Sequence, residues 1–84
     1  MSQKDKLIER LLRMPKDFTF EETRQLMGYF GYTIAPGGKT GGSRIAFTNE
    51  SGDYIRMHKP HPRSILKAYQ VKNLIDDLKE RGII

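Results

Sequence analysis

Two short segments of alternating apolar and polar residues, joined by a cluster of turn-forming residues, constrain the fold of this chain most. Residues 43–48 and 54–59 each alternate with the period of two that is typical of a β-strand with one buried face. Residues 49–53 (Asn-Glu-Ser-Gly-Asp) between them predict a turn. We therefore expect an antiparallel hairpin whose inward-facing side chains are Ile45, Phe47, Ile55 and Met57.

The register of this hairpin follows from the requirement that both strands bury the same face. A three-residue loop at residues 50–52 meets that requirement and places Asn49 opposite Asp53. The outward-facing side chains then form the cross-strand pairs Thr48–Tyr54, Ala46–Arg56 and Arg44–His58. Because partners of this kind have Cβ atoms about 4.5–5.5 Å apart, Arg44 and His58 are predicted to be neighbours.

Helical patterns flank the hairpin on both sides. Residues 4–13 carry an apolar stripe, a second helix begins after Thr19 and ends near Gly31, and a third spans residues 71–81. Thr19 and Glu22 fit a capping box. The expected inward residues of the helices are Leu7, Ile8, Leu11 and Leu12, then Leu26, Met27 and Phe30, then Val71, Leu74, Ile75 and Leu78.

A further strand is predicted at residues 32–35, before Pro36, Gly37 and Gly38 break the alternation. Residues 63–69 fit either a turn or an extra helical turn, and we expect Tyr29 and Tyr69 to pack at the edge of the core. The predicted fold class is α+β, with a three-stranded antiparallel sheet covered by helices on one face.

Length and composition limit the remaining possibilities. A chain of 84 residues encloses one modest core, so residues 1–84 should form a single domain. The absence of cysteine excludes disulfides, thiolate metal sites and a cysteine nucleophile. No stretch approaches the roughly 18–20 apolar residues that span a bilayer, so we expect a soluble cytoplasmic protein with no membrane partner. Two histidines three residues apart in a segment with two prolines, with few acids nearby, predict no metal site and no cofactor.

The positive charge of the chain is concentrated in its middle. The net charge is +5, and residues 36–72 alone carry seven basic and two acidic side chains, together with both histidines. A localised positive field of this kind favours polyanions, nucleic acid first and anionic lipid second. A merely solvated basic surface is the alternative interpretation.

The predicted pair of Arg44 and His58 has the chemistry of an RNA-cleaving site. Cleavage without a metal needs a base that works near neutral pH, which imidazole supplies, and fixed positive charge on the phosphoryl oxygens, which guanidinium supplies. Further charge, backbone amides and a stacking surface are expected from Lys39, Lys59, Gly41, Gly42 and Tyr54. Alternatively, the glycines form an ordinary hairpin loop, His58 binds a backbone carbonyl, and His61 only stiffens a turn between Pro60 and Pro62.

Residues 19–84 resemble the HicA family of toxins. The resemblance lies in the helix at 19–30, the glycine-rich loop, the segment Gly42-Ser43-Arg44-Ile45-Ala46-Phe47, the segment His58-Lys59-Pro60-His61-Pro62 and the terminal helix. It implies a double-stranded-RNA-binding-like fold, with residues 1–17 as an N-terminal helical extension of a core at 18–84. It also implies cleavage of messenger RNA and neutralisation by a HicB-like antitoxin. The family's catalytic histidine in Gly-Ser-His corresponds here to Arg44.

We therefore expect the toxin of a toxin–antitoxin system, a metal-independent endoribonuclease or mRNA interferase. The candidate catalytic residues are His58, Arg44 and His61, and the candidate RNA-binding residues are Lys39, Gly41, Gly42, Ser43, Tyr54, Arg56, Lys59, Arg63 and Lys67. The antitoxin is expected to cover the basic face. The main alternative is a non-catalytic RNA-binding module that uses the same face. A DNA-binding role for the last helix is disfavoured by Asp76, Asp77 and Glu80.

Overall fold

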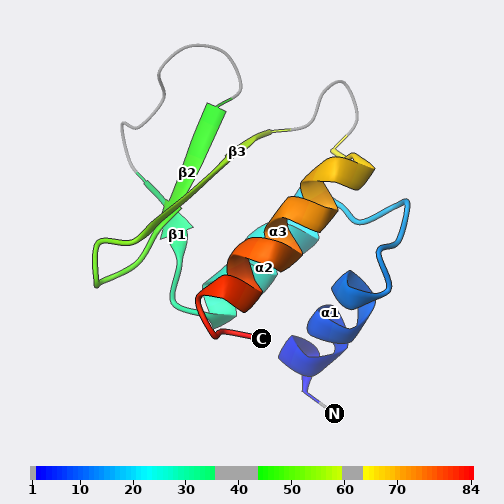
Figure 1. Cartoon of the computed structure of the whole chain (residues 1–84), viewed down its shortest axis with the longest axis horizontal. Coiled ribbons are helices and arrows are strands. Elements are labelled where there is room, and N and C mark those ends of the chain that lie inside the picture. Colours follow the sequence, from blue (N-terminus) through cyan, green and yellow to red (C-terminus); the bar gives the residue numbers. More distant parts are fainter. Residues whose placement is uncertain (1, 36–43, 60–63) are drawn as a thin grey trace.

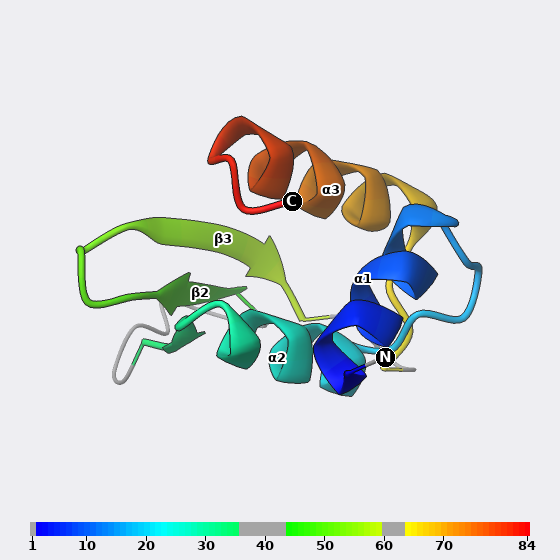
Figure 2. The same ribbon diagram turned by 90° about the horizontal axis from the view of Figure 1, so that it is seen from below.

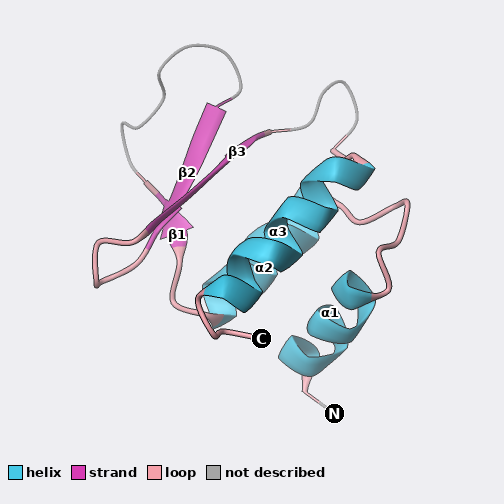
Figure 3. Ribbon diagram, viewed as in Figure 1, coloured by secondary structure: helices cyan, strands magenta, loops and turns pink. Residues whose placement is uncertain are grey.

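The computed structural model describes residues 2–35, 44–59 and 64–84. This part of the chain contains three helices and a three-stranded antiparallel sheet, so the protein is α+β (Figures 1 and 3). The elements follow in the order α1 (Gln3–Leu12), α2 (Phe20–Tyr29), β1 (Thr33–Ile34), β2 (Arg44–Thr48), β3 (Tyr54–His58) and α3 (Ala68–Glu80). None of the described helices has the length and apolarity that crossing a bilayer requires.

The sheet has the strand order β1-β2-β3, and helices lie on one side of it. Figure 1 shows α2 and α3 on the same side of the strands, with α1 beyond them, and the turned view of Figure 2 separates the two helices, with α3 on the β3 side and α2 on the β1 side. Helix α1 packs against both α2 and α3. The opposite face of the sheet is left open, as the alternation of the two hairpin strands predicts.

One continuous apolar cluster joins the three helices to the sheet. Its largest fully buried side chains are Phe18, Phe47, Leu11, Leu26, Met27, Leu78 and Val71. Leu7 and Leu11 of α1 belong to this cluster, so the first helix shares the core of the following elements. The prediction for Leu12 was wrong: its side chain is 45% exposed, because the stripe of α1 that faces α2 and α3 is narrower than its run of leucines.

Helix α2 begins as its sequence predicts. The Thr19 hydroxyl accepts a hydrogen bond from the Glu22 backbone N–H (3.0 Å), and the Glu22 carboxylate accepts one from the Thr19 N–H (3.0 Å). Arg10 of α1 also donates to Glu22, with 2.7 Å between Nε and Oε2. The Arg10 guanidinium lowers the pKa of Glu22, so one carboxylate both caps α2 and holds α1.

Residues 64–69, part of the segment that fits either a turn or an extra helical turn, contain a short extended stretch and the start of α3. Phe18 and Thr19 hold this stretch: the Leu66 N–H donates to the Phe18 carbonyl (2.8 Å), and Thr19 forms a β-bridge with Ile65. Helix α3 then begins at Ala68, one turn before the expected start at residue 71. Its added turn carries Tyr69 at the surface.

The prediction that Tyr29 and Tyr69 pack at the core edge was wrong. Their side chains are 49% and 56% exposed, respectively. Each lies next to an inward position of its helix, and the inward places are taken by Leu26 and Met27 in α2 and by Gln70 and Val71 in α3.

Candidate nucleic-acid interface

The predicted register of the hairpin is confirmed. Arg44 lies opposite His58, Ala46 opposite Arg56, and Thr48 opposite Tyr54. Phe47 and Ile55 on the other face are buried in the core. The open face therefore carries the predicted outward residues, of which Arg44, Tyr54, Arg56 and His58 are exposed. We call these four residues the open-face cluster.

Two members of the open-face cluster contact each other along β3. The guanidinium carbon of Arg56 lies 5.9 Å from the centre of the Tyr54 ring, and the tyrosine is 50% exposed. This cation–π contact holds a positive charge next to an accessible aromatic ring. Such a pair matches the phosphate and base of one nucleotide.

The end of β3 that carries His58 is fixed by a buried amide. Gln70 is only 7% exposed, and its Nε2 donates to the His58 carbonyl at 2.8 Å. Its Oε1 accepts from the Lys67 backbone N–H at 3.0 Å, at the start of α3. Gln70 was not among the predicted inward residues, although its spacing from Leu74 puts it on the inward stripe of the helix, because a polar side chain does not contribute to an apolar pattern.

The other end of β3 is fixed by an ionic contact. Arg81 Nε donates to Asp53 Oδ2 at 2.5 Å, and the Tyr32 hydroxyl donates to the same oxygen at 2.6 Å. The hydrogen bond from Arg81, followed by that from Tyr32, lowers the pKa of Asp53 to about 2. Burial, and then the Asp53 carboxylate, raises the pKa of Tyr32. Arg81 Nη2 also donates to the Tyr54 carbonyl at 3.2 Å. Helix α3 thus holds β3 at both ends.

The outer edge of β3 carries the backbone groups of residues 54, 56 and 58. The Ala35 N–H donates to the Ala46 carbonyl (2.8 Å), so the backbone N–H and C=O of Ala46 point toward β1. In an antiparallel pair the hydrogen-bonded positions alternate, and Arg56, opposite Ala46, therefore points its N–H and C=O away from β2.

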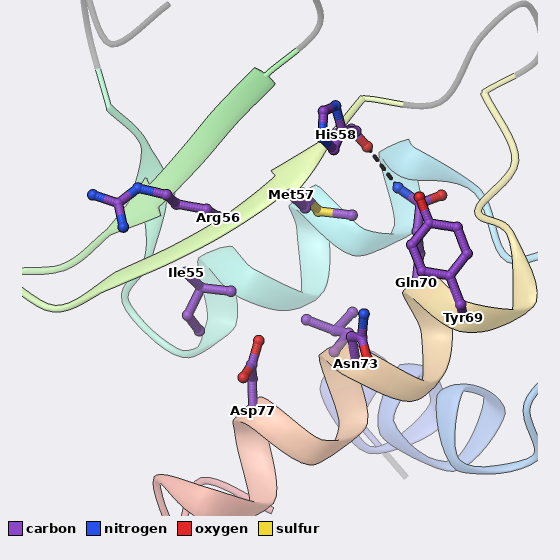
Figure 4. Close-up of a pocket in the computed structure, with 9 residues that line it drawn as sticks. Ile55, Arg56, Met57, His58, Tyr69, Gln70, Asn73 and Asp77 are labelled. Atoms are coloured by element: carbon purple, nitrogen blue, oxygen red, sulfur yellow. Dashed lines mark hydrogen bonds between the residues drawn. The ribbon is translucent and has the colours of Figure 1, made fainter. Parts of the chain in front are cut away.

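A groove of about 140 Å³ lies between this edge of β3 and helix α3. Figure 4 shows Tyr69, Asn73 and Asp77, on successive turns of α3, directed toward β3. The side chains of Arg56 and His58 extend away from α3 onto the open face. Apolar side chains that line the groove are Ile55, Met57 and Leu74. This groove was not predictable from the sequence, because it depends on how α3 packs beside the sheet.

The remaining predicted site residues are distributed differently. Lys59 lies with its ammonium 5.7 Å from the centre of the Phe20 ring of α2, so the structure does not place it in the open-face cluster. Lys67 is the exposed N-cap of α3. The predictions for Lys39, Gly41, Gly42, Ser43, His61 and Arg63 lie outside the described residues. Among the residues that are described, no three histidine or acidic side chains are grouped closely enough to hold a metal ion.

The arrangement thus combines an imidazole and a guanidinium on paired positions, a cation–π pair beside them, and a groove around the edge of β3. Comparisons with models of protein families, with curated proteins and with solved structures found no match for this chain.

Proposed function

We propose that the protein is a HicA-like toxin, a metal-independent endoribonuclease that cleaves messenger RNA in the cytoplasm and is neutralised by a HicB-like antitoxin. The observation that carries the proposal is the pairing of two exposed residues, Arg44 and His58, across adjacent strands. The order of α2, three antiparallel strands and α3 is compatible with the double-stranded-RNA-binding-like fold that the resemblance implies, with α1 as the added element.

In the proposed reaction, the His58 imidazole takes the proton from a ribose 2′-hydroxyl. The 2′-oxygen forms a bond to the adjacent phosphorus, and the bond from phosphorus to the 5′-oxygen breaks. The Arg44 guanidinium binds the phosphoryl oxygens, on which negative charge increases in the transition state. Water supplies the proton for the leaving 5′-oxygen, so the products are a 2′,3′-cyclic phosphate and a 5′-hydroxyl end.

Substrate binding is assigned to the rest of the open-face cluster. Arg56 neutralises a neighbouring phosphate and Tyr54 stacks on a base. The proposal also assigns RNA contacts to Lys39, Arg63 and Lys67. An antitoxin with an acidic surface covers the same face and blocks the substrate by charge and by steric exclusion.

A non-catalytic RNA-binding module is the second candidate, and Arg44 favours it. The HicA family has a histidine at this position, whereas an arginine binds phosphate without taking up a proton at neutral pH. The two candidates share the interface and differ only in whether His58 acts as a base.

The experiment compares the wild-type protein with His58→Ala and Arg44→Ala in cleavage of a model transcript and in growth arrest after expression. Arg24→Ala is the matched control, because Arg24 is an exposed arginine on α2, paired with Glu21. We expect cleavage by the wild type and by Arg24→Ala, and a loss of about 10²-fold or more in His58→Ala. Full activity of His58→Ala contradicts the assigned base, and salt-dependent binding without cleavage by the wild type favours the non-catalytic module.

A further inference from the structure

We infer that the groove between β3 and α3 is a base-binding pocket selective for guanine. The inference rests on the proposed function, because its ligand is a nucleotide of the RNA bound at Arg44 and His58. It assigns a base preference to the site and a role to side chains of α3 that the proposed cleavage does not use.

The groove is continuous with the open face around a single strand. Residues 55–58 of β3 line it, and the same strand carries Arg56 and His58 on the open face. A nucleotide whose phosphate lies at His58 therefore has only the edge of β3 between it and the groove. Along this edge the Arg56 backbone N–H and C=O point outward, which adds hydrogen-bonding groups to the pocket wall.

The shape and lining of the groove suit a flat, partly apolar ligand. Ile55, Met57 and Leu74 provide apolar surface, and Tyr69 supplies a ring that is 56% exposed at one end. Stacking of a base on an aromatic ring is sequence-tolerant, so Tyr69 contributes affinity for any base. A volume of about 140 Å³ is on the scale of one ring system and much smaller than a cofactor pocket.

Selectivity comes from Asn73 and Asp77, one helical turn apart. A carboxylate only accepts hydrogen bonds, whereas an amide both donates and accepts. Guanine presents two adjacent donors, N1–H and the N2 amino group, which match the Asp77 carboxylate, and an O6 acceptor, which matches the Asn73 amide. Adenine and cytosine present a ring-nitrogen acceptor in place of N1–H, and uracil has a single donor between two carbonyl oxygens.

The charge of Asp77 is compatible with a nearby phosphate. Arg81 Nη1 lies 3.7 Å from Asp77 Oδ1, so a positive group partly offsets the carboxylate. The side chain of Asp77 is still 40% exposed, so its carboxylate can accept hydrogen bonds from a ligand.

The test is a titration of the ¹⁵N-labelled full chain with the 3′-monophosphates of guanosine, adenosine, cytidine and uridine, followed by amide chemical shifts. We expect the guanosine nucleotide to bind about tenfold more tightly than the others. It should change the amide chemical shifts of the open-face cluster and also those of Asn73 and Asp77. Asp77→Asn should abolish this preference. Asp76→Asn is the matched control: the same charge is lost one residue away, where Asp76 pairs with Lys72 outside the groove.

Tyrosine variants separate stacking from base reading. Tyr69→Leu should weaken the binding of all four nucleotides alike. Tyr29→Leu removes a similarly exposed tyrosine from α2 and should leave the binding of all four unchanged. Equal binding of all four nucleotides, with shifts at Arg44 and His58 but none along α3, overturns the pocket and leaves the proposed function standing. Absence of shifts at Arg44 and His58 with every nucleotide overturns both.

Discussion

Substitution of Gln70 by methionine tests how the candidate site is held in place. Gln70 connects the last residue of β3 to the first turn of α3 through two hydrogen bonds, to the His58 carbonyl and from the Lys67 N–H. Methionine keeps the unbranched shape and the length of the side chain but makes neither bond. Gln70→Met therefore removes the connection without opening a cavity.

The expected loss of stability follows from those two bonds. Each intramolecular hydrogen bond contributes about 0.5–1.5 kcal/mol net, which gives about 1–3 kcal/mol for the pair. Both hydrogen bonds are only part-buried, so water can hydrate the released carbonyl and N–H in part, and the loss should fall in the lower part of that range, about 1–2 kcal/mol. For a domain of this size such a loss lowers Tm by roughly 4–15 °C.

Urea denaturation followed by circular dichroism measures this loss, and Gln25→Met is the matched control because Gln25 is exposed on α2. A second reading is the carbonyl ¹³C shift of His58, which should move in Gln70→Met, whereas that of Tyr54, held by Arg81, should not. A loss of stability below about 0.5 kcal/mol, within the range of ordinary surface substitutions, refutes the assigned role of Gln70.

Two further predictions concern the ionic contact and the core. Asp53 has a pKa lowered to about 2 from the 3.8 of an ordinary aspartate, so its contribution to stability is complete above about pH 4 and is lost as pH falls through 2. Urea denaturation at pH values from 5 to 2 should show this loss in the wild type. The same dependence of stability on pH in Asp53→Asn contradicts the prediction. Leu78→Ala should lower the free energy of unfolding by about 2–5 kcal/mol because Leu78 is fully buried, whereas Leu12→Ala should lower it far less because Leu12 is 45% exposed. Equal losses of stability in urea denaturation contradict the assigned core.

The hairpin was predictable because its information is local. Alternation assigns each side chain to a face, and only registers that bury both apolar sets together are allowed, so the pairing of Arg44 with His58 followed from the order of residues. The cap of α2 was equally local, since Thr19 and Glu22 are three residues apart.

The features that the sequence did not reveal depend on contacts between distant segments. Helix α3 begins early because residues 64–66 are held beside residues 18–20, and no pattern within residues 63–69 records that contact. Gln70 is buried because its two partners lie within reach of its amide, which polarity alone does not indicate. The groove exists only where α3 lies against the outer edge of β3.

The attachment of β3 at both ends also bears on self-association. An outer strand with unpaired backbone groups is a template on which a second copy of the chain can add a strand. Here the carbonyls of Tyr54 and His58 already accept hydrogen bonds from Arg81 and Gln70, respectively, and the backbone N–H and C=O of Arg56 lie between them. A second copy must displace a charged side chain and a buried amide before a ladder can extend, so the contacts that position the candidate site also oppose aggregation along this edge.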